Sequence, residues 1–137
     1  MAELLAPVGS IQALYTAIYS GADAVYLGLD QFNARIKADN FNLDNISHYI
    51  NLAHLFGVKV YITFNTNVKP NEMVDMEKYI KVASEAKADA FIVTDLGMLG
   101  VYRKYNVPLH ASTQMGIHNL AGAKYLENMG FSRVVLS

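Results

Sequence analysis

A sequence pattern that occurs four times constrains the fold of this chain more than any other feature. The copies lie at residues 20–29, 56–65, 86–95 and 129–137. In each copy, a helix-like segment ends and a short run rich in Val, Ile, Tyr and Phe follows. Three copies carry a glycine between the helix-like segment and the apolar run, and the copy at 86–95 has alanine in place of this glycine. Glycine suits the left-handed position just past a helix end, and near-continuous apolar runs are typical of parallel strands covered on both faces.

Helical patterns lie between these apolar runs. Ile11, Leu14 and Ile18 share one helix face, and Ser10 precedes them as an N-cap. The expected strands are 3–6, 24–29, 58–64, 90–94, 108–111 and 133–137, and the expected helices are 10–20, 43–56, 71–86, 96–104 and 117–129. Strict alternation implies a parallel sheet with right-handed crossovers. A (β/α) barrel and an open doubly wound sheet both fit, although the first strand is not followed by the dinucleotide-binding G-x-G-x-x-G motif.

The length of 137 residues suits one α/β domain, residues 1–137. Six strands and five helices make about three-quarters of an eight-unit barrel of roughly 200–250 residues. We therefore expect a partial TIM-like barrel that is the N-terminal part of a longer protein. Open edges near "ELLA" and "RVVLS" favour self-association, most simply as a two-fold dimer; the alternative is closure of a smaller barrel.

Composition excludes several classes of function. The net charge of −1 argues against direct nucleic-acid binding by this segment. With no cysteine, the chain has no disulfide, no thiolate nucleophile and no cysteine-ligated metal or iron–sulfur cluster. The N-terminus lacks the features of a signal peptide, and no apolar run approaches the length of a membrane span. We expect a cytoplasmic protein without a membrane partner.

Polar residues collect where the expected strands end. His110, Ser112 and Gln114 follow one another in "PLHASTQMG", residues 108–116. Sites in parallel α/β folds lie at the carboxyl ends of the strands. We therefore expect Arg35, Asn65, His110 and Gln114, from three strand–loop junctions, to converge on one pocket.

Each of these residues also has a purely structural interpretation. Asp95, His110 and Ser112 can be combined into a catalytic triad, but residues two apart on a strand are separated by ~6.6 Å, too far for the usual Ser–His hydrogen bond. For Asp95, capping of the following helix is the favoured alternative. Ser112 can stabilise its turn, Asn65 can cap its loop, and Arg35 can be a solvated loop residue.

Six segments together resemble the N-terminal part of peptidase family U32, the collagenase-like proteases. They are "ELLAPVGSIQAL", "GADAVYLGLDQFNAR", "GVKVYITFNT", "FIVTDLGML", "LHASTQM" and "MGFSRVVLS". The resemblance covers essentially the whole chain and implies a TIM-barrel-like catalytic region of bacterial or archaeal origin. Some members are named as peptidases of unassigned catalytic type. Others are involved in oxygen-independent hydroxylation of tRNA bases, rRNA bases or a quinone precursor, with an iron–sulfur cluster held by cysteines.

The residues that match the family's motifs are Asn33 and Arg35 of "FNAR", Asn65 of "TFNT", Asp95 of "TDLG", and His110, Ser112 and Gln114 of "HASTQ". The cysteine-bearing segment of the family lies downstream of Ser137, so no cofactor is expected in this chain.

Three functions are therefore open. The first is a peptidase with a peptide or small-molecule substrate. Its candidate catalytic residues are His110, Ser112 and Asp95, and its candidate substrate-binding residues are Asn33, Arg35, Asn65 and Gln114. The second is part of an RNA-base hydroxylation enzyme, and the third is an inactive barrel fragment.

Overall fold

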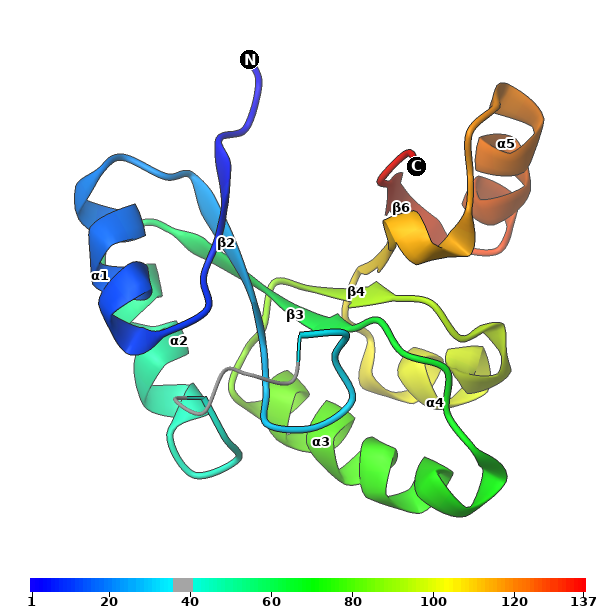
Figure 1. The fold of residues 1–137 in the computed structure, drawn as a ribbon, viewed down its shortest axis with the longest axis horizontal. Coiled ribbons are helices and arrows are strands. Elements are labelled where there is room, and N and C mark those ends of the chain that lie inside the picture. Colours follow the sequence, from blue (N-terminus) through cyan, green and yellow to red (C-terminus); the bar gives the residue numbers. More distant parts are fainter. Residues whose placement is uncertain (36–40) are drawn as a thin grey trace.

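The computed structural model describes residues 1–35 and 41–137, in which six strands alternate with five helices (Figure 1). The strands are β1 Leu5–Pro7, β2 Ala24–Gly28, β3 Lys59–Phe64, β4 Ala90–Val93, β5 Leu109–Ala111 and β6 Phe131–Val134. The helices are α1 Ile11–Tyr19, α2 Ile46–Leu55, α3 Met73–Glu85, α4 Leu99–Tyr102 and α5 Leu120–Asn128. Short 3-10 turns occupy Pro70–Glu72, Leu96–Met98, Arg103–Tyr105 and Thr113–Met115. No helix of the described residues is both long enough and apolar enough to cross a membrane.

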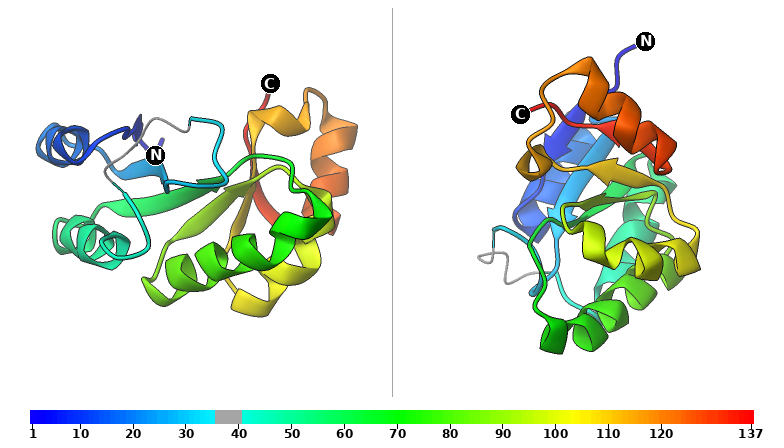
Figure 2. Two further views of the ribbon diagram at one scale, coloured as in Figure 1. Left: turned by 60° about the horizontal axis from the view of Figure 1, so that its bottom comes forward. Right: turned by 90° about the vertical axis from the view of Figure 1, so that its right-hand side faces the viewer.

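The strands form one parallel sheet in the order β1-β2-β3-β4-β5-β6. A doubly wound sheet reverses its strand order at one point, whereas this order follows the sequence throughout, as in a barrel. The helices lie along the outer side of the fanned strands (Figure 2). In the described residues the sheet stays open, with β1 and β6 as its edges. The closed smaller barrel is therefore not formed.

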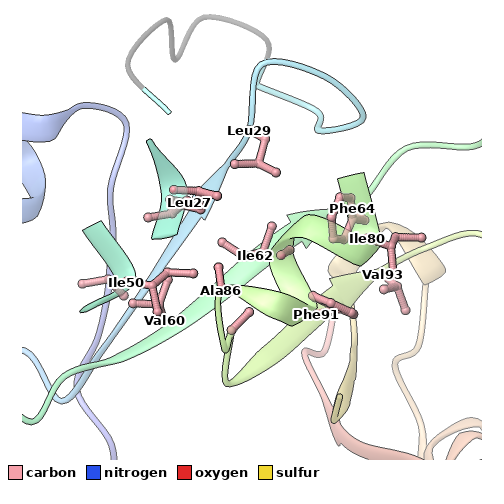
Figure 3. Close-up of a cluster of buried hydrophobic side chains, with 14 of the residues drawn as sticks. Leu27, Leu29, Ile50, Val60, Ile62, Phe64, Ile80, Ala86, Phe91 and Val93 are labelled. Carbon is pink, nitrogen blue, oxygen red and sulfur yellow. The ribbon is translucent and has the colours of Figure 1, made fainter. Parts of the chain in front are cut away.

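The two faces of the sheet are buried differently. Alternate residues of β3, Val60, Ile62 and Phe64, belong to the large core between sheet and helices, where Ile50 of α2 and Ile80 of α3 also lie (Figure 3). On the other face a smaller apolar cluster contains strand residues alone: Ala24, Tyr61, Ala90 and Ile92, with Leu5 and Tyr26 beside them. In the described chain no helix residue belongs to this second cluster, and this side of the sheet is called the helix-free face below.

The repeat produces the expected helix ends. Gly21, Gly57 and Gly130 have φ angles of 90°, 72° and 98°. In the copy at 86–95, however, the left-handed residue is Lys87, with φ of 67°, and not an alanine. The predicted N-cap is confirmed, because the Ser10 side chain accepts a hydrogen bond from the Ala13 amide at 3.0 Å.

Some expected boundaries were wrong. The helix expected at 43–56 begins at Ile46, because the Asn42 side chain accepts hydrogen bonds from the Asp44 and Asn45 amides and holds a turn there. The helix expected at 96–104 is a single α-helical turn between two 3-10 segments. Glycines at 97 and 100 disfavour a longer α-helix. The last strand begins at Phe131, not at 133.

Candidate functional site

A pocket of about 310 Å³ opens on the helix-free face of the sheet, towards the carboxyl ends of the strands. Leu5, Tyr26 and Ile92 of three strands contribute apolar surface. Polar surface comes from the loops that follow β2, β3 and β5, through Asn33, Arg35, Asn65, Ser112, Thr113 and Gln114. The apolar strand surface and the polar rim suit a small ligand with one ring face and several hydrogen-bonding groups.

The predicted convergence is confirmed for three of the four residues. Arg35, Asn65 and Gln114 line the same pocket. The prediction was wrong for His110, which pairs in register with Ile92 and Arg133 inside the sheet and is 6% exposed. Ser112, two residues further along, reaches the pocket in its place.

Two asparagines hold the loop that follows β2. The Asn33 side chain donates to the Leu29 carbonyl and accepts from the Arg35 amide at 2.9 Å. Asn65, at the end of β3, accepts a hydrogen bond from the Ala34 amide at 2.9 Å. Both side-chain oxygens are therefore used on the backbone, whereas the Arg35 side chain is exposed.

The structure does not assemble Asp95, His110 and Ser112 into a catalytic triad. Asp95 caps the turn after β4: its two carboxylate oxygens accept from the Gly97 and Val68 amides, each at 2.8 Å. Ser112 likewise caps its own turn, because its Oγ accepts from the Gln114 amide at 3.3 Å. The capping interpretation of both residues is confirmed.

His110 belongs instead to a cluster inside the sheet. Its ring packs edge-on against Tyr61, with 4.8 Å between centroids. The Tyr61 hydroxyl donates to Glu3 at 2.9 Å, and Arg133 donates to the same carboxylate at 2.8 Å. The Arg133 guanidinium also lies 5.5 Å from the centre of the Tyr61 ring. This group, Glu3, Tyr61, His110 and Arg133, is called the interior cluster below.

The interior cluster shifts the pKa of its members. Burial, followed by the positive charge of Arg133, lowers the pKa of His110 to about 4, so its imidazole is neutral at pH 7. The hydrogen bond from Arg133 is the largest cause that lowers the pKa of Glu3. Burial, and then the hydrogen bond to Glu3, raises the pKa of Tyr61. A buried imidazole of such low basicity, with no hydroxyl partner among the described residues, is poorly suited to activating a serine.

Sequence reasoning missed Glu3, Tyr61 and Arg133. Strand alternation places Tyr61 on the helix-free face, but Glu3 and Arg133 are 130 residues apart and no local pattern connects them. Their contact follows only from the way the sheet brings its first and last strands towards each other.

The family model described as peptidase family U32 matches residues 9–137. The chain belongs to peptidase family U32. It is 39% identical over 137 residues to the uncharacterized protease MJ0090 of Methanocaldococcus jannaschii, covering 100% of this chain and 33% of that protein. It is 34% identical over 137 residues to tRNA hydroxylation protein P1 of Bacillus subtilis, covering 98% of this chain and 32% of that protein. The chain thus spans about a third of the length of these relatives.

A solved structure supports the same fold. The U32 peptidase Mk0906 superposes with a TM-score of 0.75 at 14% sequence identity, covering 99% of this chain and 58% of that one. At this identity the likeness concerns the architecture alone.

An iron–sulfur cluster does not fit the residues of this U32 chain. Cluster iron is held chiefly by cysteine thiolates, and the sequence contains no cysteine. Within residues 1–35 and 41–137, no group of three or more His, Asp or Glu side chains is placed to hold a metal ion. No step is therefore assigned to such a cluster in this chain.

Proposed function

We propose that this U32 chain forms the substrate-binding part of an enzyme that hydroxylates a base of RNA. The observation that carries the proposal is the pocket at the carboxyl ends of the strands, which is lined by apolar strand residues and by amide side chains. Enzymes that modify a nucleobase take the base out of its stack and hold it in such a pocket by stacking and by hydrogen bonds to its edge. The name of the Bacillus subtilis relative supports this choice of substrate.

The size of the pocket favours one ring system over an extended peptide. Its volume of about 310 Å³ lies at the lower end of the ~300–1,000 Å³ range of small-molecule sites. Tyr26 and Ile92 supply flat or apolar surface, and Gln114 and Thr113 supply polar groups at the rim. A base needs both kinds of contact, because its faces are apolar and its edge is polar.

The chain's own part in the reaction is limited to binding. Replacing a base C–H by C–OH is a two-electron oxidation that requires an oxygen donor and an electron acceptor, and we assign neither to these residues. The net charge of −1 also argues against a broad phosphate-binding surface on this chain. In our proposal it holds one nucleotide, and other parts of the protein contact the rest of the RNA. A cytoplasmic location, expected from the sequence, suits an RNA substrate.

Peptide hydrolysis is the second candidate, because the relative at 39% identity is named a protease. Against a serine-type mechanism, the Asp95 oxygens and the Ser112 Oγ are engaged with backbone amides, and His110 lies outside the pocket lining. The peptidase assignment stays a prediction. Gelatin and short peptides are its substrates for testing, with His110→Ala as the diagnostic variant; cleavage that this variant abolishes would favour it.

The proposal is tested in cells that lack the gene. Mass spectrometry of their tRNA and rRNA is expected to show the loss of one hydroxylated base. The intact gene should restore it, and a gene carrying Gln114→Ala should restore less, because the base loses a contact at the pocket rim. A gene carrying Lys81→Gln, on the exposed side of α3, is the matched control. An RNA modification profile that is unchanged by the deletion contradicts the proposal.

A further inference from the structure

We infer that Arg35 binds a phosphate of the nucleotide whose base occupies the pocket, and that Gly28, Asn33 and Asn65 are positioning residues that hold Arg35 in place. The inference rests on the proposed function and deepens it, since it specifies a nucleotide within a chain, and not a free nucleoside, as the ligand of this pocket.

The charge of the pocket comes from Arg35. Among the described residues that line it, Arg35 is the one charged side chain, and no carboxylate accompanies it. An exposed guanidinium at the rim of an otherwise neutral pocket attracts an anionic ligand group. Its planar set of donors matches phosphate oxygens through paired hydrogen bonds.

Asn33 is an integral part of the loop that follows β2. Asn33 is 2% exposed, and both ends of its amide are engaged, with the Leu29 carbonyl and the Arg35 amide. A polar side chain this deeply buried is stable only with such partners. Because the bond to the Arg35 amide fixes the backbone from which the guanidinium extends, Asn33 acts on the ligand through Arg35.

Gly28 is the residue that makes room for Asn33. A Cβ built on Gly28 would lie 2.7 Å from Nδ2 and 2.8 Å from Oδ1 of Asn33. These separations are shorter than real Cβ contacts, so any other residue at position 28 has to displace the Asn33 amide. The Gly28→Ala substitution therefore displaces the Asn33 amide and disturbs the loop while Arg35 itself is retained.

Two further contacts fix the loop from neighbouring elements. The Asn65 side chain, at the end of β3, accepts from the Ala34 amide at 2.9 Å. Phe32, with φ of 61°, packs edge-on against Tyr79 of α3 at 5.4 Å between ring centroids. The segment before Arg35 is thus attached to its own strand, to β3 and to α3. A group held in place before binding loses less entropy when it meets its ligand.

The test compares ligands with and without phosphate. Isothermal titration of the 137-residue chain uses the four ribonucleosides and their 3′,5′-bisphosphates, which carry both flanking phosphates of a residue in RNA. We expect the bisphosphate of the preferred base to bind about tenfold more tightly than its nucleoside, as one charge-assisted contact provides. The preference should weaken as salt is raised.

The variants separate contact from positioning. Arg35→Gln is expected to abolish the phosphate preference and leave nucleoside affinity within about twofold, and Arg35→Lys should restore part of the preference. Gly28→Ala and Asn65→Ala should lower the preference in the presence of an intact Arg35. Lys81→Gln, which also removes one cation, should leave the preference unchanged. Amide NMR spectra of each variant establish that it is folded.

The possible outcomes distinguish failure of the Arg35 inference from failure of the proposed function. Equal binding of nucleoside and bisphosphate, or a preference that survives Arg35→Gln, overturns the inference and leaves the proposed function standing. If neither ligand class binds, the proposed function fails and the inference fails with it. A peptide with a free carboxyl terminus is the third ligand. If it alone binds, and amidation of that terminus or Arg35→Gln removes binding, the anion at Arg35 is a peptide carboxylate and the nucleotide assignment is wrong.

Discussion

The interior cluster makes the stability of the fold depend on pH through His110. This side chain is 6% exposed and packs against Tyr61. The charged groups that act on it are Arg133 of β6 and Lys59 of β3, which disfavour the imidazolium, and Glu3, which favours it. Burial is the largest cause, and together these effects lower the pKa to about 4 from an ordinary value of 6.5.

The direction of the effect follows from proton binding. As the pH falls below about 6.5, the unfolded chain protonates His110, whereas the folded chain does so only near pH 4. Within that window the unfolded state binds more protons, so the free energy of unfolding decreases as the pH falls. Each pH unit corresponds to about 1.4 kcal/mol, so the loss over the whole window is at most about 3 kcal/mol. Above the window His110 contributes no pH dependence.

The assay is urea unfolding of the wild-type chain and of His110→Phe at several pH values across this window. Phenylalanine keeps the aromatic contact with Tyr61 and cannot titrate. The free energy of unfolding of the wild type should fall by about 2–3 kcal/mol more than that of the variant between about pH 7 and about pH 4.5. The decrease in the free energy of unfolding that results from protonation of Glu3 is common to both chains and cancels in the comparison. Parallel curves for the two chains would refute the reasoning.

Three further predictions concern caps, the interior cluster and the sheet edges. Asp95→Ala should lower the free energy of unfolding in urea by about 1–2 kcal/mol, because two backbone amides lose their acceptor; a change below the error of the measurement contradicts the capping role. A double-mutant cycle on Glu3→Gln and Arg133→Gln should give a coupling of about 0.5–1 kcal/mol, because the pair is partly exposed; zero coupling would show that the ion pair adds nothing. Light scattering at micromolar concentration should show a concentration-dependent dimer, because β1 and β6 are the open edges of the described sheet, and a monomer at all concentrations is the contrary result.

The fold could be predicted from the sequence because the repeated pattern consists of short-range features that indicate where each helix ends and each strand begins. The left-handed glycine after a helix and the apolar run that follows are short-range features, and together they specify a parallel α/β sheet. The exceptions have local causes as well. Lys87 has a left-handed backbone conformation, which a lysine does not indicate in a sequence. The Asn42 side chain stabilises a turn before α2.

The position of the site could be predicted from the sequence, whereas the roles of its individual side chains could not. Parallel topology gathers strand ends, so Arg35, Asn65 and Gln114 were placed correctly without any knowledge of distances. Asp95 and Ser112 have side chains that suit both capping and catalysis, and only their hydrogen bonds distinguish the two. His110 was misplaced because it lies two residues before Ser112 on the same face of the sheet, and that offset of ~6.6 Å along the chain keeps its ring out of the pocket lining. The Glu3–Arg133 contact depends on curvature, which no local pattern encodes.

The central claim is that the pocket at the carboxyl ends of the strands holds a nucleobase. Its most direct test is an NMR titration of the isotope-labelled 137-residue chain with each ribonucleoside and with a short peptide. The account predicts that one nucleoside shifts the amide signals of Asn65, Ser112 and Gln114, and that residues on the exposed side of α3 stay unchanged. If no nucleoside shifts these three signals, or if the peptide shifts them and the nucleosides do not, the claim is contradicted.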